Sequence, residues 1–347
     1  MKVLNQGNDE RSLLDAIVGD GRPFLAFTGL VLILSGGFAL FLSATKHFLP
    51  HDVQHLGMTA EELCRIQQCR IVHFMIHDRV SFGGALIAIG FLYLWLAEFP
   101  LRAGAAWAWW VFLASGILGF GSFLTYLGYG YLDTWHGTGT LLLLPFFIVG
   151  LWRSYFALPG PKHIRCVLHP SAPLLGGSRP ALGRLFLIGT ATGLVGAGLT
   201  IMTLGMTYVF VPQDLAFMGL AADDLRAVNP RLVPLIAHDR AGFGGAVACA
   251  GIIILASVWC GTLSRSLWQT LAVAGAFGFG TAVGIHPAIG YTDAIHVGPA
   301  VAGAVTFTIG LFLARGAGLS RCTPRDTPGA ARTPSPARGA HPTETGT

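Results

Sequence analysis

The sequence HDRVSFGGA at residues 77–85 returns as HDRAGFGGA at residues 238–246, and seven of the nine positions are identical. Both copies lie within long apolar stretches. Placing a histidine, an aspartate and an arginine in succession inside a membrane-spanning segment costs free energy. Such residues therefore indicate a functional or structural site.

Other matches occur in the same order along the chain, at offsets that stay between 159 and 162 residues. They pair Phe48 with Phe210, Gly119-Phe120-Gly121 with Gly278-Phe279-Gly280, Tyr131 with Tyr291, Asp133 with Asp293 and His136 with His296. A nearly constant offset over this length indicates one duplication, so the sequence predicts two homologous halves.

The composition is that of a membrane protein. Hydrophobic residues make up 53% of the 347 and charged residues 11%, and the mean hydropathy is +0.61. Eight apolar stretches reach the roughly 20 residues that a membrane-spanning helix needs, at about 23–43, 70–97, 105–126, 134–154, 184–209, 232–259, 266–286 and 293–314. The predicted fold class is an all-α integral membrane protein, with eight transmembrane helices arranged as two tandem homologous four-helix bundles.

The spans and the repeat together predict the domain organisation. A cytoplasmic N-terminal segment (1–22) precedes the first four-helix half (23–155), and a cytoplasmic linker (156–183) leads to the second half (184–316). A tail rich in Pro, Thr, Gly, Ala and Arg (317–347) is predicted to be disordered and cytoplasmic. Because each half has an even number of spans, both halves enter the membrane from the same side.

Basic residues predict the orientation. Arginines precede the first span and recur between spans two and three, in the linker and in the tail, all on one side if both termini are cytoplasmic. The net charge of +5 is then a topology signal, and no nucleic-acid partner is expected. In the first external loop, Cys64 and Cys69 are spaced to form a disulfide or a thiol redox pair.

Four of the repeated polar residues are histidines, namely His77, His136, His238 and His296. Each has about 25–30 Å of helix between it and the cytoplasmic end of its span, at 1.5 Å per residue, so all four lie near the external boundary. Spans two and four of each half run in the same direction, so we expect His77 to face His136 and His238 to face His296. Two imidazoles from facing helices are typical axial ligands of haem iron, and haem is the predicted cofactor.

The neighbours of these histidines suit the same hypothesis. Gly84 and Gly245 lie two turns beyond His77 and His238 on the same helix face, where a missing side chain leaves room for a flat macrocycle. Arg79 and Arg240 lie near the membrane boundary, where they could pair with haem propionates. The alternatives are close helix packing for the glycines and a helix-locking Asp–Arg pair for the charged residues.

A metal ion without haem is a second hypothesis. His73 and His77 share one helix face, and Asp133 and His136 share another, as in zinc or non-haem iron sites. Because His73 has no counterpart in the second half, we expect substrate chemistry in the first half, with His73 and Asp78 as the candidate catalytic residues. The alternative from another class is a haem-free transporter or assembly factor, whose His-Asp-Arg elements handle protons or lock helices.

Eight spans in two halves, with one histidine near the external end of every second span, resemble the haem A synthase family over about residues 23–316. Gly57-Met58-Thr59 before span two, Asn229-Pro230 before span six and the external cysteine pair are also similar to that family.

The resemblance implies that the four histidines bind haem in a bacterial cytoplasmic membrane. It also implies an oxidoreductase that acts on a haem-type substrate or serves a quinone, as family members oxidise a methyl group of haem O. Two features differ. Asp78 and Asp239 stand where the family has arginine directly after the histidine, and Phe74 stands in place of an expected glutamate.

Overall fold

The computed structural model describes residues 18–45, 47–124, 128, 130–131, 134–173 and 177–315, and within these ranges it leaves out the side chains of residues 135 and 136. Asp133, the side chain of His136, the predicted tail and most of the predicted N-terminal segment therefore lie outside the described residues. The part that is described is helical and contains no strand.

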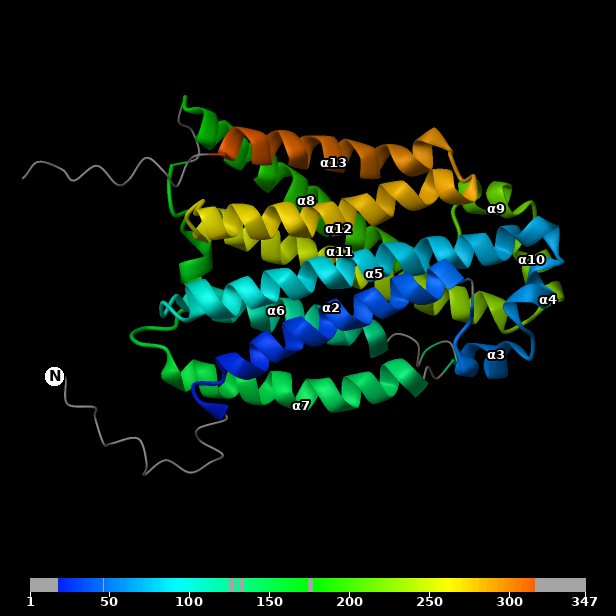
Figure 1. The fold of residues 1–347 in the computed structure, drawn as a ribbon, viewed down its shortest axis with the longest axis horizontal. Coiled ribbons are helices and arrows are strands. Elements are labelled where there is room, and N and C mark those ends of the chain that lie inside the picture. The colour runs from blue at the N-terminus through cyan, green and yellow to red at the C-terminus, as the bar shows by residue number, and fades with distance from the viewer. Residues whose placement is uncertain are drawn as a thin grey trace, which may run out of the picture.

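Eight long helices run back and forth along one axis (Figure 1). They are α2 (Arg22–Thr45), α5 (Arg70–Leu96), α6 (Ala106–Phe123), α7 (Thr134–Ala157), α8 (Arg179–Met206), α11 (Leu232–Cys260), α12 (Arg265–Ile289) and α13 (Ala294–Ala314). Each is long and apolar enough to cross a membrane, which confirms the predicted all-α integral membrane class with eight spans.

Four short helices gather at the end of the bundle opposite to the start of α2 and the end of α13 (Figure 1). They are α3 (Pro50–Leu56), α4 (Ala60–Cys64), α9 (Pro212–Met218) and α10 (Ala222–Val228). Proline at the first position begins α3 and α9, because its fixed φ suits a helix start. Gly57 and Gly219 end them with φ of 68° and 71°, a conformation that glycine adopts without steric cost.

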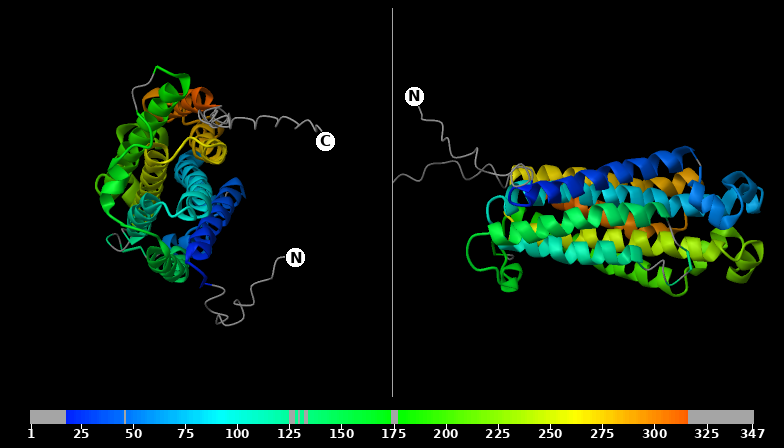
Figure 2. Two further views of the ribbon diagram at one scale, coloured as in Figure 1. Left: turned by 90° about the vertical axis from the view of Figure 1, so that its left-hand side faces the viewer. Right: turned by 90° about the horizontal axis from the view of Figure 1, so that it is seen from below.

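The long helices pack in a ring in which α5 and α11 approach each other across the middle, and Figure 2 (left) shows the bundle end-on. The ring runs in the order α2, α5, α12, α13, α8, α11, α6, α7 and back to α2, and α5 also packs against α11 across the middle. The second span therefore packs mainly against spans one, six and seven, and the sixth against spans two, three and five. This differs from two self-contained bundles, because α6 and α12 are exchanged between the two groups of four helices.

Glycine contacts explain why α2 lies so close to α5 and α8 to α11. A Cβ at Gly36 would come within 2.4 Å of the Gly83 carbonyl oxygen, and one at Gly198 within 2.6 Å of the Gly244 carbonyl oxygen. Small residues at such crossings let two backbones touch, which is how helices associate where no water drives them together. The contacts fix the register of α2 against α5 and of α8 against α11.

Candidate functional site

Two buried carboxylates lie over one end of the bundle, carried by α3 and α9. Asp52 is 1% exposed and Asp214 is fully buried. Each accepts a hydrogen bond from a backbone N–H just before its helix, Asp52 from Leu49 at 3.3 Å and Asp214 from Val211 at 2.9 Å. Buried charges require partners, and here the two His-Asp-Arg elements supply them.

Arg79 of α5 binds two carboxylates at once. Its Nη1 lies 2.8 Å from Asp52 Oδ2, and its Nε donates to Asp239 Oδ2 at 2.9 Å. Asp52 belongs to the short helix α3, which lies before α5 along the chain, and Asp239 belongs to the central helix α11.

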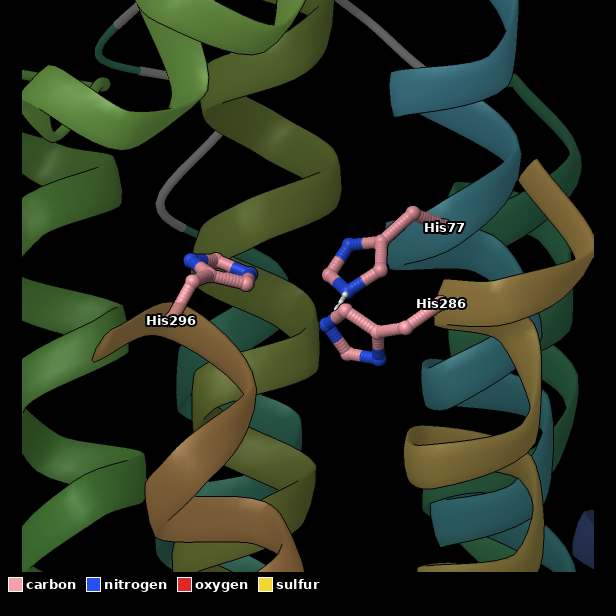
Figure 3. Close-up of side chains that lie close together, drawn as sticks. All are labelled: His77, His286 and His296. Carbon is pink, nitrogen blue, oxygen red and sulfur yellow. Dashed lines mark hydrogen bonds between the residues drawn. The ribbon is translucent and has the colours of Figure 1, made fainter. Parts of the chain in front are cut away.

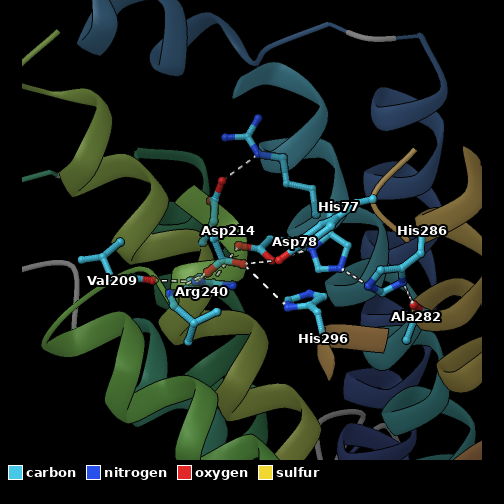
Figure 4. A network of polar contacts seen from close by, with 12 residues as sticks. His77, Asp78, Val209, Asp214, Arg240, Ala282, His286 and His296 are labelled. Atoms are coloured by element: carbon cyan, nitrogen blue, oxygen red, sulfur yellow. Dashed lines mark hydrogen bonds and ion pairs between the residues drawn. The ribbon is translucent and has the colours of Figure 1, made fainter. Parts of the chain in front are cut away.

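Arg240 of α11 repeats this arrangement in the opposite direction (Figure 4). Its Nη1 donates to Asp214, on the short helix that precedes α11, and its Nε lies 3.5 Å from Asp78 Oδ2 on α5. The two arginines are therefore crossed, and each joins α5 to α11. Both inter-helix pairs, Arg79 with Asp239 and Arg240 with Asp78, agree with the alternative given above, in which aspartate and arginine lock helices together.

Two tyrosines complete the carboxylate sites. Tyr131 donates to Asp52 Oδ1 at 2.6 Å, and Tyr291 to Asp214 Oδ1 at 2.8 Å. Burial by itself would raise the pKa of Asp52, but the charge of Arg79 and the Tyr131 hydrogen bond outweigh it and hold the pKa below its usual value. Burial and the Asp214 carboxylate raise the pKa of Tyr291, so this hydroxyl stays a donor at neutral pH.

Three histidines from three helices converge (Figure 3), and Asp78 lies beside them (Figure 4). They are His77 of α5, His286 of α12 and His296 of α13, and one ring nitrogen of each lies within 4.8 Å of the other two. The Nε2 atoms of His77 and His286 are only 3.1 Å apart. His77 and His286 are buried, and the His296 side chain is 15% exposed.

Neighbouring acceptors fix the tautomers of two of these rings. His77 Nδ1 lies 2.9 Å from Asp78 Oδ1, and His286 Nδ1 lies 2.7 Å from the carbonyl oxygen of Ala282. An ionised carboxylate and a carbonyl only accept hydrogen bonds, so in the neutral rings both Nδ1 atoms carry the proton. The two Nε2 lone pairs then face each other, which requires a shared extra proton or a metal cation.

His296 has its own carboxylate neighbour. Its Nδ1 lies 3.7 Å from Asp214 Oδ1, and its ring stacks on Tyr291 at a centroid separation of 4.3 Å. Asp293 caps the start of α13 by accepting from the backbone N–H of Ile295 and of His296. The cap and the stacked ring hold His296 toward the other two histidines.

A cavity of about 1040 Å³ adjoins the three histidines and runs between α5, α8, α11, α12 and α13. His77, Asp78, Gln213, Arg240, His286 and His296 line its polar end. Most of the remaining wall is alanine, glycine, leucine, isoleucine and phenylalanine. The cavity therefore has a polar end at the histidines. The rest of it, its apolar body, lies between the membrane-spanning helices.

The other predicted ligands lie elsewhere or are not described. His238 faces Tyr131, with ring centroids 5.3 Å apart, and is not in the histidine cluster. His136 lies in α7, and its side chain is outside the described residues. His296 was expected to face His238 but lies beside His77 (centroids 5.4 Å apart), because α5 packs against α12 on the side where α13 follows in the ring.

The other sequence-predicted residues are distributed as follows. Gly84 and Gly245 do not line the cavity: a Cβ there would come within 1.8 Å of Thr281 Oγ1 and 2.2 Å of the Ser122 side chain, as expected for close helix packing. His73 lies one turn before His77 in α5 and is also absent from the lining, whereas Asp78 is part of it. Cys64 and Cys69 are joined by a disulfide, and Arg79 and Arg240 are held by carboxylates as described above.

Sequence reasoning missed His286. The repeat drew attention to residues that occur twice, and neither residue that the offsets of 160 and 159 align with His286, Tyr126 or Leu127, is a histidine. One signal was present, since His286 is a histidine at the very end of an apolar span, followed by Pro287.

Comparison with known protein families, curated proteins and solved structures found no match to this chain.

Proposed function

We propose that this chain is an integral membrane protein with a metal centre bound by His77, His286 and His296, and that it belongs to the oxidoreductases. The observation that carries the proposal is the 3.1 Å distance between the Nε2 atoms of His77 and His286, while both Nδ1 atoms face hydrogen-bond acceptors. With both Nδ1 atoms protonated, the two Nε2 lone pairs repel each other. A metal cation between the rings turns this repulsion into two bonds. Metal-binding histidines usually donate their other N–H to a carboxylate or a backbone carbonyl, which are the two acceptors present.

The spacing of the ligand atoms supports a metal ion. Metal–nitrogen bonds of about 2.0–2.1 Å in a tetrahedral site separate two ligand nitrogens by about 3.3 Å. The 3.1 Å between His77 and His286 is close to this, and His296 offers a third nitrogen within 4.8 Å. Three protein ligands and an open fourth position are typical of catalytic sites, and here the open side adjoins the cavity.

The surrounding charge also favours a cation. Asp78 and Asp214 contribute two negative charges and Arg240 one positive charge, which leaves one net negative charge beside three neutral imidazoles. In a site with little solvent, this excess lowers the energy of a bound cation far more than it would in water.

Haem iron is the second candidate for the metal, as the sequence predicts, with His77, His286 and His296 as the residues that would hold it. The cavity favours haem, because about 1040 Å³ next to the ligands leaves space for a macrocycle, and imidazole is a typical axial ligand. The cavity lining fits less well. Arg240 is the only arginine or lysine among the described lining residues, and its two carboxylate partners already balance its charge, so propionates have no free cation.

Tandem duplication and cytoplasmic termini belong to the same proposal. The crossed arginines support duplication, since Arg79 and Arg240 make equivalent contacts 161 residues apart in the sequence. Tryptophans mark a membrane interface at the end of the bundle where α2 begins: Trp95, Trp107, Trp109, Trp110, Trp152, Trp259 and Trp268. Tryptophan occurs at both interfaces, so the orientation is supported by the basic residues of this end, which favour the cytoplasm of a bacterial cell.

Metal analysis and a visible spectrum of the detergent-purified protein test the proposal. We expect one metal ion per chain, sharply reduced by His77→Ala, His286→Ala or His296→Ala and retained by His238→Ala. An intense Soret absorption would identify the metal as haem iron, and its absence with metal present would identify a bare ion. A wild-type chain that stays metal-free after incubation with iron, zinc and copper would refute the metal centre. The haem-free transporter or assembly factor would then be favoured, with the crossed arginines as its locks.

A further inference from the structure

The cavity extends far beyond the space that a metal ion needs. On α8 its lining reaches from Leu182 to Leu204, about 33 Å at 1.5 Å per residue, which is about the thickness of the hydrocarbon core of a bilayer. On α12 it reaches from Ala274 to His286, about 18 Å. Its volume is at the upper end of the roughly 300–1,000 Å³ of small-molecule sites. An elongated apolar molecule fits this shape.

The polar atoms of the apolar body are already hydrogen-bonded within the protein. Thr190 donates to the Phe186 carbonyl oxygen at 2.9 Å and lies 3.0 Å from Thr306, and Thr306 donates to the Ala302 carbonyl oxygen at 2.8 Å. These hydroxyls therefore present mainly their methyl groups to the cavity. The body of the cavity suits a hydrocarbon chain.

Ser81 is different. It lies one helical turn beyond His77 on α5, lines the cavity and is 2% exposed, yet its Oγ has no hydrogen-bond partner among the residues that the structure describes. A buried hydroxyl without a partner costs about 1–3 kcal/mol, and native proteins rarely leave one so. The aligned residue in the other half is Gly242, so the hydroxyl belongs to this cavity alone. It points to a ligand that brings a hydrogen-bonding atom to this position.

The charge of the lining restricts the head of that ligand. The charged residues of the described lining are Asp78 and Arg240, which form an ion pair at 3.5 Å. A phosphate head would therefore enter a low-dielectric site without a free cation as its partner, which is strongly unfavourable. An uncharged head is favoured over an anionic one.

We propose that this cavity binds a membrane-soluble molecule with one long hydrocarbon or isoprenoid chain and an uncharged, oxygen-bearing head, and that the head lies between Ser81 and the histidines. Prenylated quinones and long-chain alcohols share this chemistry. The inference rests on the proposed function in that it names the ligand class of the metal centre. Binding of the ligand's hydrocarbon chain, however, does not require the metal. The two proposals can therefore fail independently.

Two glycines of α8 provide a matched pair of variants. Gly193 lines the cavity and Gly196 does not, and a Cβ at either position meets nothing within 4 Å. Gly193→Phe therefore fills the cavity, whereas Gly196→Phe adds the same side chain to the same helix outside it.

Binding of a long-chain benzoquinone and of a long-chain primary alcohol to the purified protein, measured by native mass spectrometry, tests the proposal. We expect one molecule per chain, at least tenfold weaker binding in Gly193→Phe and unchanged binding in Gly196→Phe. Ser81→Ala should weaken binding about five- to tenfold, the worth of one hydrogen bond, without weakening binding of an alkane of equal length. The alcohol and quinone arms show which head is preferred.

Equal affinity of the two phenylalanine variants, or an alkane that binds wild type as tightly as the headed molecules, would overturn the proposal. So would a phosphatidylglycerol that competes as well as the uncharged probes. His286→Ala separates this inference from the metal centre: the metal should be lost while the probe still binds. If the probe binds only when metal is present, the cavity does not hold the hydrocarbon chain of the probe by itself, and the inference is wrong.

Discussion

Arg79 Nε donates to Asp239 Oδ2 at 2.9 Å and thereby joins the two central helices, α5 and α11. Arg240 returns the contact with its Nε 3.5 Å from Asp78 Oδ2. The same tripeptide that supplies His77 to the histidine cluster thus also connects the two crossing helices.

Arg79→Leu should destabilise the protein by about 3–5 kcal/mol, because it leaves Asp52 and Asp239 buried without their shared cation. The unfolding transition in detergent, followed by circular dichroism against heat or increasing sodium dodecyl sulfate, measures this. Arg226→Ala is the control: it breaks an exposed pair with Asp223 and should change stability by about 0.5 kcal/mol or less. Equal losses in the two variants would contradict a role for Arg79 as a lock.

The acid limit of stability should depend on Asp52. Its pKa in the folded protein lies below that of an unfolded aspartate, about 3.9, so the ionised form contributes stability above about pH 4. This contribution is lost as the pH falls through the folded-state pKa. The difference in melting temperature between wild type and Asp52→Asn should be largest at neutral pH and shrink below about pH 4. Glu61→Gln, on an exposed residue, is the control and should show no such trend, whereas a difference that grows in acid would refute the assignment.

The eight spans were predictable because hydropathy and length alone decide which segments can cross a bilayer, as at α5 and α11. The repeat singled out His77 and His296, and both lie in the cluster of three histidines. Which helix faces which was not predictable. The exchange of α6 and α12 depends on which faces carry small residues, and Gly84, for example, packs against Thr281 of α12.

His286 shows a second limit of repeat-based reasoning. A site that is built where two halves differ contains residues without a counterpart, and both His286 and Ser81 are of this kind. Their significance depends on distances across helices: 3.1 Å to His77 in one case, and a missing hydrogen-bond partner in the other. No spacing along the chain encodes either relationship.

The contact between α2 and α5 should depend on one glycine and be insensitive to the next. A Cβ at Gly36 would lie 2.4 Å from the Gly83 carbonyl oxygen, a backbone atom that cannot move alone, whereas a Cβ at Gly37 meets nothing within 4 Å. Gly36→Val should therefore destabilise by about 1–3 kcal/mol or more through overpacking. Gly37→Val changes helix propensity equally and is the control. Melting temperatures of the two variants in the same detergent decide the matter, and similar values would show that α2 and α5 do not pack as closely as described.

Asp78 should control the affinity of the proposed metal centre as a positioning residue. Its Oδ1 accepts from His77 Nδ1 at 2.9 Å and so directs the Nε2 lone pair toward His286. Loss of such a partner typically weakens metal binding about 10- to 100-fold, which we expect for Asp78→Ala in a competition titration with a metal-sensitive dye. Asp78→Asn should be intermediate, because the amide oxygen still accepts the hydrogen bond but carries no charge. Asp239→Ala removes the equivalent lock contact to Arg79 without touching the cluster, so it should lower stability and leave metal affinity unchanged. If Asp239→Ala weakened the metal as much as Asp78→Ala did, the effect would lie in helix docking and not in the orientation of His77.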